Sequence, residues 1–180
     1  MTETPTILTY ASIVSRYSVS IALNIADING IDILSCKIQN TYLTAECREK
    51  IWTQADPEFG SDAGTIMIVR MTLYGPKSSI AAFCAHLAET LNEIGFLSTK
   101  GEPGGWYQTT VKPSSFDYYK YILCYVDDIL YISHDPGISV RRMQAVFKFK
   151  GDKMEQPEIY LEDQVRKMII DGEEGWYISA

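Results

Sequence analysis

Apolar side chains recur at helical spacing near the start of the chain. From Ser12 onward they lie three or four residues apart, and the pattern ends at Gly30. This spacing predicts an amphipathic helix, and glycine is suited to the left-handed residue that follows a helix. We expect the helix to pack on a sheet through one stripe, which consists of Ile13, Tyr17, Ile21, Ile25 and Ile28.

Two further segments have helical spacing. Between Ile80 and Ile94 the apolar positions form one continuous face that stops before Gly95. A shorter helix is predicted from Gly137 to residue 147. Runs rich in apolar, β-branched and aromatic residues predict strands at 31–38, 50–53, 65–69, 106–108, 164–170 and 176–179, with a turn at 171–175 between the last two.

The stretch from Tyr121 to Ser133 combines two apolar runs, each able to form a strand, which are joined through Asp127 and Asp128. No Gly, Asn or Pro softens the turn, so a hairpin here is costly. Two carboxylates at a hairpin tip repel each other, and a divalent cation would offset the repulsion. The alternative is a solvated turn, which is the ordinary role of an Asp pair. The apolar flanks make this alternative less favoured.

Length and composition indicate one globular domain. With 180 residues and 46% hydrophobic side chains, the chain can form a single domain over residues 1–180 that removes about 70% of its unfolded surface from water. No apolar run reaches the length of a membrane span, and the start of the chain lacks the features of a signal peptide. We therefore expect an intracellular protein, in cytoplasm or nucleus, with no membrane partner. The polar residues 1–9 are expected to be disordered.

The chain is acidic, with 16 basic and 23 acidic residues and a net charge of −7. Nucleic-acid binding relies on cations that face phosphates, and the chain has no dense basic run. The four cysteines form no Cys-x-x-Cys pair, and only two histidines could complete a metal site. Buried thiols in a reducing compartment are the simpler interpretation.

The segment Tyr125-Val126-Asp127-Asp128 resembles the Tyr-x-Asp-Asp signature of reverse transcriptases, and its continuation as Ile-Leu is similar to the copia-type retrotransposons. Further segments resemble copia-type blocks in the same order along the chain: Cys36–Leu43, Lys50–Trp52, Pro57–Gly60, Leu73–Lys77, Phe147–Asp152 and Ile159–Glu162. The resemblance therefore covers most of the chain.

The resemblance implies an α/β (α+β) fold like a polymerase palm, with a mainly antiparallel sheet backed by helices and part of the fingers. It implies RNA-directed DNA polymerisation within a retrotransposon polyprotein, with an RNA or DNA template-primer and dNTPs as partners. Asp127 and Asp128 would be catalytic and would hold Mg²⁺. Relative to the family we expect a fragment that lacks the first basic strands of the fingers, the thumb, the connection and the ribonuclease H region.

The family takes a third catalytic carboxylate from the block that Cys36–Leu43 resembles, and here Lys37 occupies that position. An ammonium has no lone pair to offer a metal, and its charge repels one. We therefore expect impaired catalysis. We hypothesise that Lys37 forms an ion pair with Asp127 or Asp128 that stabilises the core without metal. The alternative is that Lys37 extends into solvent.

The resemblance also implies a nucleotide site in this region. Tyr42 matches the aromatic residue that stacks under the sugar, and a core tyrosine is the alternative. The other nucleotide-binding candidates are the backbone N–H groups of Ile38, Gln39, Asn40 and Thr41, together with Gly75 and Lys77.

These patterns favour a truncated and inactive remnant of a copia-type reverse transcriptase. The alternative is a non-catalytic domain that retains the palm fold and binds nucleic acid or protein. Retained Mg²⁺ or nucleotide binding without primer extension would favour that alternative. An acidic α/β domain of unrelated function would require the ordered motif matches to be coincidental.

Overall fold

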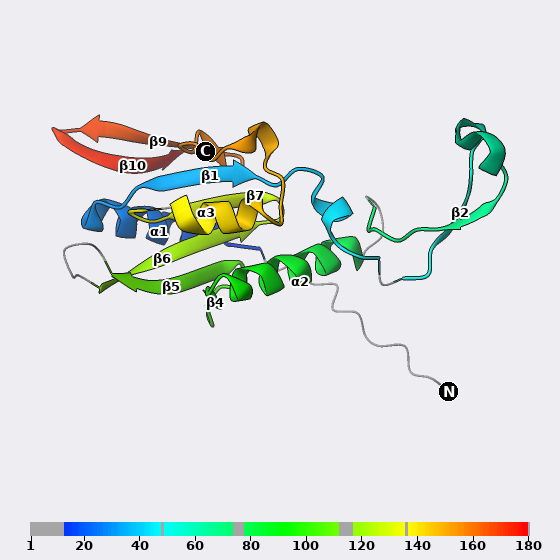
Figure 1. The fold of residues 1–180 in the computed structure, drawn as a ribbon. Coiled ribbons are helices and arrows are strands. Elements are labelled where there is room, and N and C mark those ends of the chain that lie inside the picture. Colours follow the sequence, from blue (N-terminus) through cyan, green and yellow to red (C-terminus); the bar gives the residue numbers. More distant parts are fainter. Residues whose placement is uncertain (1–12, 48, 74–77, 112–116, 136, 180) are drawn as a thin grey trace. The chain divides into compact units, whose positions relative to one another are not determined.

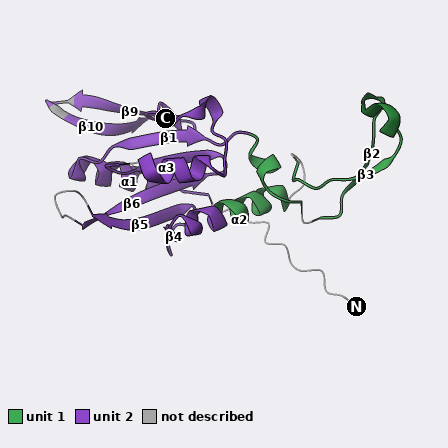
Figure 2. Ribbon diagram, viewed as in Figure 1, with its two compact units in different colours: residues 1–11, 40–87 green, residues 12–39, 88–180 purple. Residues whose placement is uncertain are grey.

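The computed structural model describes residues 13–47, 49–73, 78–111, 117–135 and 137–179 (Figure 1). The stretch 1–9, expected to be disordered, lies outside the described residues. The chain divides into two compact units, residues 1–11 with 40–87 as unit 1 and residues 12–39 with 88–180 as unit 2 (Figure 2). The prediction of one domain over residues 1–180 concerns folding as a unit and stays a prediction.

Unit 2 is built on a five-stranded antiparallel sheet. Its strands, in spatial order, are β1 (Ile33–Lys37), β7 (Asp128–Ile132), β6 (Asp117–Tyr125), β5 (Gly105–Val111) and β4 (Leu97–Ser98). The two runs predicted to flank the Asp pair form β6 and β7, with Tyr125 opposite Asp128. Because β7 lies between β6 and β1, both of its edges are hydrogen bonded.

The first predicted helix is present as α1 (Arg16–Asn29). The Ser15 side chain caps its N-terminus by accepting a hydrogen bond from the Ser18 N–H. Gly30 follows its C-terminus with φ 58°, the left-handed conformation expected of a glycine at this position.

The face of α1 that was expected to be buried was predicted wrongly. Most of the stripe is in solvent, with Tyr17 84% and Ile28 83% exposed. The helix packs instead through the smaller side chains Val19, Ala22, Leu23 and Ala26. Both stripes have helical spacing, and alanines let the helix approach its neighbours closely, which periodicity alone does not reveal.

The buried face of α1 belongs to the hydrophobic core of unit 2. The large sheet contributes Ile33, Leu123, Leu130 and Ile132 to this core. A second, three-stranded antiparallel sheet consists of β8 (Ile159–Tyr160), β9 (Asp163–Ile170) and β10 (Glu173–Ser179), in the order β10-β9-β8. This small sheet packs on the same hydrophobic core. The turn before β10 is shorter than the predicted one, because β10 begins at Glu173.

Polar contacts also connect α1 to the small sheet. The Asp27 carboxylate accepts a hydrogen bond from the Trp176 N–H at 2.9 Å. Arg16 Nη2 lies 3.0 Å from Asp163 Oδ1, and the Asp163 side chain is only 6% exposed. These contacts occupy both charged side chains of the helix.

The opposite face of β7 is buried as well. Side chains alternate along a strand, so Tyr131 points away from Leu130 and Ile132. Its ring meets Phe96 edge to face, with 6.2 Å between ring centroids. Phe96 follows α2 (Ser78–Glu93), which confirms the second predicted helix, and α3 (Gly137–Gln144) confirms the third.

Unit 1 contains a two-stranded antiparallel sheet of β2 (Trp52–Gln54) and β3 (Ile66–Ile68). β3 lies within a predicted strand, whereas β2 overlaps the strand predicted at 50–53 and ends one residue later. Two short 3-10 helices, η1 (Thr41–Thr44) and η2 (Pro57–Asp62), complete its described elements outside α2.

The chain therefore has the mixed α and β fold, with mainly antiparallel sheets, that was predicted. Its likeness to a polymerase palm stays a prediction. None of the described helices is long and apolar enough to cross a membrane.

Candidate functional site

The turn between β6 and β7 consists of Val126 and Asp127. Tyr125 and Asp128 pair across it, so the loop has only these two residues. Val126 has φ 54°, in the left-handed region that a β-branched residue rarely adopts. The expected cost of a turn without glycine or asparagine is present as backbone strain at Val126, on the order of 1–2 kcal/mol.

Strand β1 brings Lys37 to this acidic turn. The register pairs Lys37 directly with Asp128. Lys37 Nζ lies 3.1 Å from Asp128 Oδ1 and 3.5 Å from Asp127 Oδ2. One ammonium therefore contacts both carboxylates, which confirms the hypothesised ion pair over the alternative of a side chain extended into solvent.

Partial burial lowers the pKa of Lys37, but the hydrogen bonds and charges of Asp128 and Asp127 outweigh this effect and raise the pKa above its ordinary value. Lys37 is therefore a permanent cation at neutral pH. The Lys37 side chain is 46% exposed and the two carboxylate side chains 30% and 34%. Water screens the pair, so its contribution to folding stability is on the order of 0–1 kcal/mol.

An open hollow of about 350 Å³ lies beside the ion pair. Its charged lining comprises Lys37, Asp128, Lys150, Lys153 and Glu155. Lys153 Nζ lies 2.7 Å from Glu155 Oε2. Three ammonium groups thus meet two carboxylates in this hollow, although the chain as a whole is acidic.

Cys36 also lines the hollow and is buried. Burial and, to a smaller extent, the charge of Asp128 together raise the pKa of its thiol to about 12. The thiol is therefore protonated at neutral pH and is not available as a thiolate ligand.

This set of donors does not fit a pair of magnesium ions. Mg²⁺ prefers octahedral coordination by oxygen. Lys37, a donor without lone pairs, stands where strand β1 meets the two carboxylates. Across the described part of the chain, no group of three or more His, Cys, Asp or Glu side chains is placed to hold a metal ion.

Two of the backbone N–H groups predicted to bind phosphate are engaged within unit 2. The Ile38 N–H donates to the Asp127 carbonyl at 2.8 Å, and the Gln39 N–H donates to the Lys148 carbonyl at 2.7 Å. These bonds hold the end of β1 against the acidic turn. In this conformation neither N–H points to a free phosphate.

The other predicted nucleotide-binding residues are not brought to the turn within unit 2. Asn40, with φ 52°, precedes η1, and Thr41 and Tyr42 lie in that helix of unit 1. Gly75 and Lys77 lie outside the described residues. Their roles in nucleotide binding stay predictions.

Lys150 and Lys153 were not predicted as site residues. They reach the hollow because the segment 149–155 follows the outer edge of β1, where Ser35 pairs with Glu155. The signal in the sequence is the alternation of phenylalanine and lysine at 147–150, which is typical of an extended edge.

Comparison with known proteins shows similarity to a transposon protein. No family model matches the chain, and no solved structure matches it. Among curated proteins, the chain is similar to a Saccharomyces cerevisiae protein named for transposon Ty5-1, with 27% identity over 118 residues. The match covers 64% of this chain and 37% of that protein, so the chain spans well under half the length of this relative.

Proposed function

We propose that this chain is a reverse-transcriptase-like domain from a copia-type retrotransposon polyprotein and that it has lost polymerase activity. The ordered motif resemblance, the antiparallel α and β fold and the similarity to a transposon protein support the origin. We infer the loss of activity from one observation. The Lys37 ammonium contacts both carboxylates of the acidic turn.

The chemistry of nucleotidyl transfer explains why this contact matters. The reaction needs positive charge at the attacking oxygen and at the leaving pyrophosphate, which two-metal enzymes supply from ions about 3.5–4 Å apart. Lys37 supplies one tethered charge, and the two carboxylates already neutralise it. Its ammonium has no open coordination position for a substrate oxygen. The turn therefore retains two carboxylates but lacks the two positive charges that nucleotidyl transfer needs at the attacking oxygen and the leaving pyrophosphate.

The ligands implied by this origin are an RNA or DNA template-primer and dNTPs, all polyanions. The net charge of −7 opposes their binding over most of the surface. We expect any binding of these ligands to be weak and to fall steeply as salt is added, because it depends on phosphate contacts to few lysines.

The substitution Lys37→Asp tests the proposal. It removes the ammonium and adds the third carboxylate, so we expect Lys37→Asp to bind Mn²⁺ or Mg²⁺ saturably in isothermal titration calorimetry, and the unmodified chain to show no saturable binding. Lys153→Asp is the matched control, because it makes the same charge change in the same hollow. Equal metal binding by all three chains would contradict the role given to Lys37.

Activity is measured by primer extension in a context that restores the fingers and thumb. We expect extension by Lys37→Asp and none by the unmodified chain. Robust Mg²⁺-dependent extension by the unmodified chain would refute the proposal. Nucleotide binding without extension by either chain would favour the non-catalytic binding domain.

A further inference from the structure

The sheet edges of unit 2 differ in how well they are covered. An uncovered edge presents backbone N–H and C=O groups that a further strand can bind. The segment 149–155 follows the outer edge of β1 and pairs with it at Ser35. On β10, the Trp176 N–H donates to the Asp27 carboxylate of α1. The edge strand β4 has only two residues, so it offers a further strand little to pair with.

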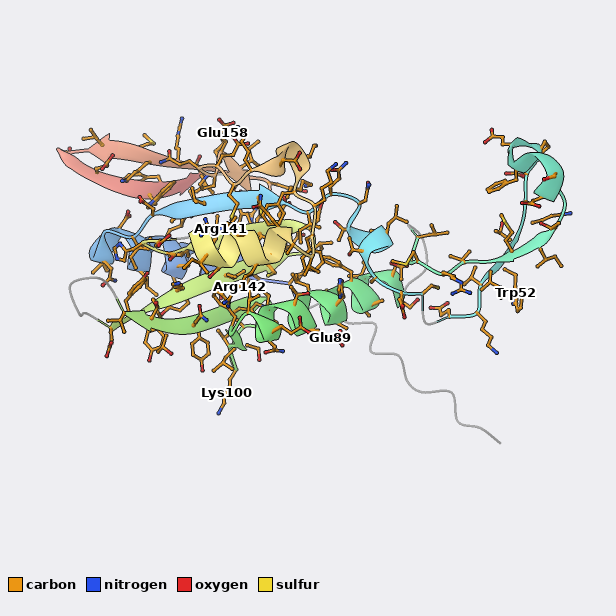
Figure 3. All side chains as sticks on the ribbon, in the orientation of Figure 1. Trp52, Glu89, Lys100, Arg141, Arg142 and Glu158 are labelled. Atoms are coloured by element: carbon orange, nitrogen blue, oxygen red, sulfur yellow. The ribbon has the colours of Figure 1, made fainter. Side chains whose placement is uncertain are left out.

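Strand β9 is open along part of one edge. It has eight residues, whereas β8, which pairs with it on that side, has two. The ladder reaches one step further, because the Val165 N–H donates to the Glu158 carbonyl at 3.0 Å, and Figure 3 labels Glu158 at this end of the small sheet. Beyond Val165, no strand among the described residues pairs with this edge.

The direction of the backbone groups on this edge follows from the pairing with β10. Lys167 is opposite Trp176, and the Trp176 N–H points away from β9 to Asp27, so the two form a non-hydrogen-bonded pair. Lys167 and, by alternation, Ile169 therefore direct their N–H and C=O groups outward. The outward bond of Val165, two residues earlier, agrees with this pattern. These outward groups have no hydrogen-bond partner among the described residues.

The side chains on the open edge do not oppose a further strand. A charged lysine on an open edge commonly prevents pairing with another chain. Here Lys167 Nζ lies 3.2 Å from Glu174 Oε2 of β10, so its charge is balanced within the hairpin. Ile169, two residues along the same edge, is 71% exposed. A partner strand would bury this apolar side chain.

A groove with a volume of about 460 Å³ lies where the open edge begins. Its lining consists of residues 156–159 and 164–167 and Trp176. At the far end of the edge, β9 turns into β10 through Asp171 and Gly172, with φ 54° and 87°, in a compact two-residue turn. Arg166 at the groove and Asp171 at the turn are exposed, and neither forms an ion pair among the described residues.

We propose that two copies of this chain associate through the open edges of their β9 strands, antiparallel about a two-fold axis at Met168. The two small sheets then form one continuous sheet. Lys167 of each copy pairs with Ile169 of the other, and both are hydrogen-bonded pairs. The outward N–H and C=O groups of these residues are thereby satisfied in both copies. The inference does not depend on the proposed function.

The backbone and the charges of β9 select this register. With the axis at Met168, the turn of one copy comes opposite Val165 of the other, where the groove lies. Asp171 of one copy then lies next to Arg166 of the other, and the two-fold axis makes this contact twice. An axis at Lys167 would oppose the two lysines. It would also require the Val165 N–H, which already donates to Glu158.

The identity of the partner follows from the same charges. The open backbone groups alone would accept any extended strand. A second copy supplies a strand with matching outward groups and an acidic turn for each Arg166. The contact is smaller than a standard interface of about 800 Å² per partner, so we expect a dissociation constant on the order of 100 μM.

Sedimentation velocity of the full chain, from low micromolar to millimolar concentration, measures the association. We expect a monomer at the low end and mostly dimer at the high end. A chain that remains monomeric throughout overturns the proposal, because its open edge is then protected from pairing with a second copy.

Amide hydrogen exchange over the same concentrations identifies the paired groups. The amides of Lys167 and Ile169 should exchange severalfold more slowly when the chain is dimeric. The Met168 N–H faces β10, where Met168 is opposite Gly175, so its exchange is the internal control and should change less. Dimers without slower exchange at Lys167 and Ile169 would place the interface elsewhere and overturn the proposal.

Two substitutions at Ile169 separate the backbone from the side chain. Ile169→Pro removes an outward N–H and no bond of the β9–β10 ladder, and an edge strand tolerates proline at such a position. We expect it to weaken association tenfold or more. Ile169→Ala removes most of the same exposed side chain and keeps the N–H, so it should weaken association less than threefold. Equal weakening by both variants would overturn pairing through the backbone.

A charge exchange tests the register without proline. Arg166→Glu and Asp171→Lys each oppose like charges at both ends of the contact, so each variant alone should dimerise more weakly than the unmodified chain. An equimolar mixture should form heterodimers, because both contacts regain opposite charges. Circular dichroism checks that each variant is folded. A mixture that associates no better than either variant alone overturns the proposed register.

Discussion

The β6–β7 hairpin and the β2–β3 hairpin are both antiparallel pairs with isoleucine on the strands, yet they differ in what surrounds them. The first lies inside a five-stranded sheet, between β5 and β1, and Ile129 is 0% exposed. The second forms a sheet of its own, and Ile66 is 74% exposed. The local pattern thus predicts a hairpin in both places, and neighbouring strands and helices decide which one becomes core.

The surroundings also decide what a hairpin can tolerate at its tip. The buried hairpin holds Val126 in a left-handed conformation and two carboxylates side by side. Such strain persists only where the rest of the structure over-determines the backbone. The exposed hairpin places Gly64, with φ 83°, at its left-handed position, where glycine costs nothing sterically.

The largest expected difference between the hairpins lies in their isoleucines. Ile129→Ala removes a fully buried side chain and should lower the free energy of unfolding by about 2–5 kcal/mol. Ile66→Ala changes an exposed side chain and should change it by less than about 0.5 kcal/mol. Urea denaturation measures both. Similar losses for the two variants would show that the comparison is wrong.

A smaller effect is expected from Glu102, which stabilises the N-terminus of α1. Its carboxylate accepts hydrogen bonds from the Ser15 hydroxyl at 2.7 Å, from the Ser15 N–H at 3.2 Å and from the Ser18 hydroxyl. Glu102→Gln keeps the shape and removes the charge, so we expect a loss of about 1–2 kcal/mol at pH 7. Glu58→Gln, at the tip of the exposed hairpin, is the matched control and should cost nothing measurable in the same urea titration.

The pH dependence of this loss has a definite sign. Burial raises the pKa of Glu102, but the hydrogen bonds from Ser18, Ser15 and the Gly104 N–H outweigh it and lower the pKa. A lowered folded-state pKa stabilises the fold above the unfolded carboxyl's pKa and stops doing so as the pH falls through the folded value. The difference between the unmodified chain and Glu102→Gln should therefore disappear in acid. A constant difference down to the acid transition would contradict the charged hydrogen bonds.

The acidic turn was predictable because its hairpin joins two strands that are adjacent in the sequence, and the position of its lysine was predicted from the family resemblance. The two apolar runs around Asp127 and Asp128 specify a hairpin, and the resemblance placed Lys37 on a neighbouring strand. The structure then shows Lys37 opposite Asp128.

Other features could not be predicted because they depend on packing between distant segments. The choice between two apolar stripes of α1 depends on the small sheet that ends the chain, where Trp176 meets the helix. The position of Lys150 and Lys153 depends on a segment that follows the edge of β1. The first relation leaves no periodic signal in the sequence, and the alternation at 147–150 indicates an extended segment without showing which strand it follows.

The strain at Val126 gives a prediction with the opposite direction. Val126→Gly should relieve the left-handed strain, and the greater freedom of glycine in the unfolded chain should offset part of the gain. We expect a net stabilisation of about 0.5–1 kcal/mol. Val146→Gly, at a half-exposed position without positive φ, is the control and should destabilise. Destabilisation by both variants would show that Val126 contributes packing that outweighs its strain.

The smallest expected effect concerns the lysine at the acidic turn itself. Lys37→Met keeps the aliphatic stem and removes the charge, so the two carboxylates lose their shared partner. Because the ion pair is partly exposed, we expect a loss of about 0.5 kcal/mol, which added salt should reduce.

Asp128 and Asp127 raise the pKa of Lys37 above its ordinary value despite the opposing effect of burial. A raised folded-state pKa stabilises the fold below the unfolded lysine's pKa, and this stabilisation is lost as the pH rises through the folded value. The difference between the unmodified chain and Lys37→Met should therefore be constant from neutral pH to about pH 10 and vanish above it. A difference that persists at higher pH would mean that Lys37 stabilises the turn through its stem rather than through its charge.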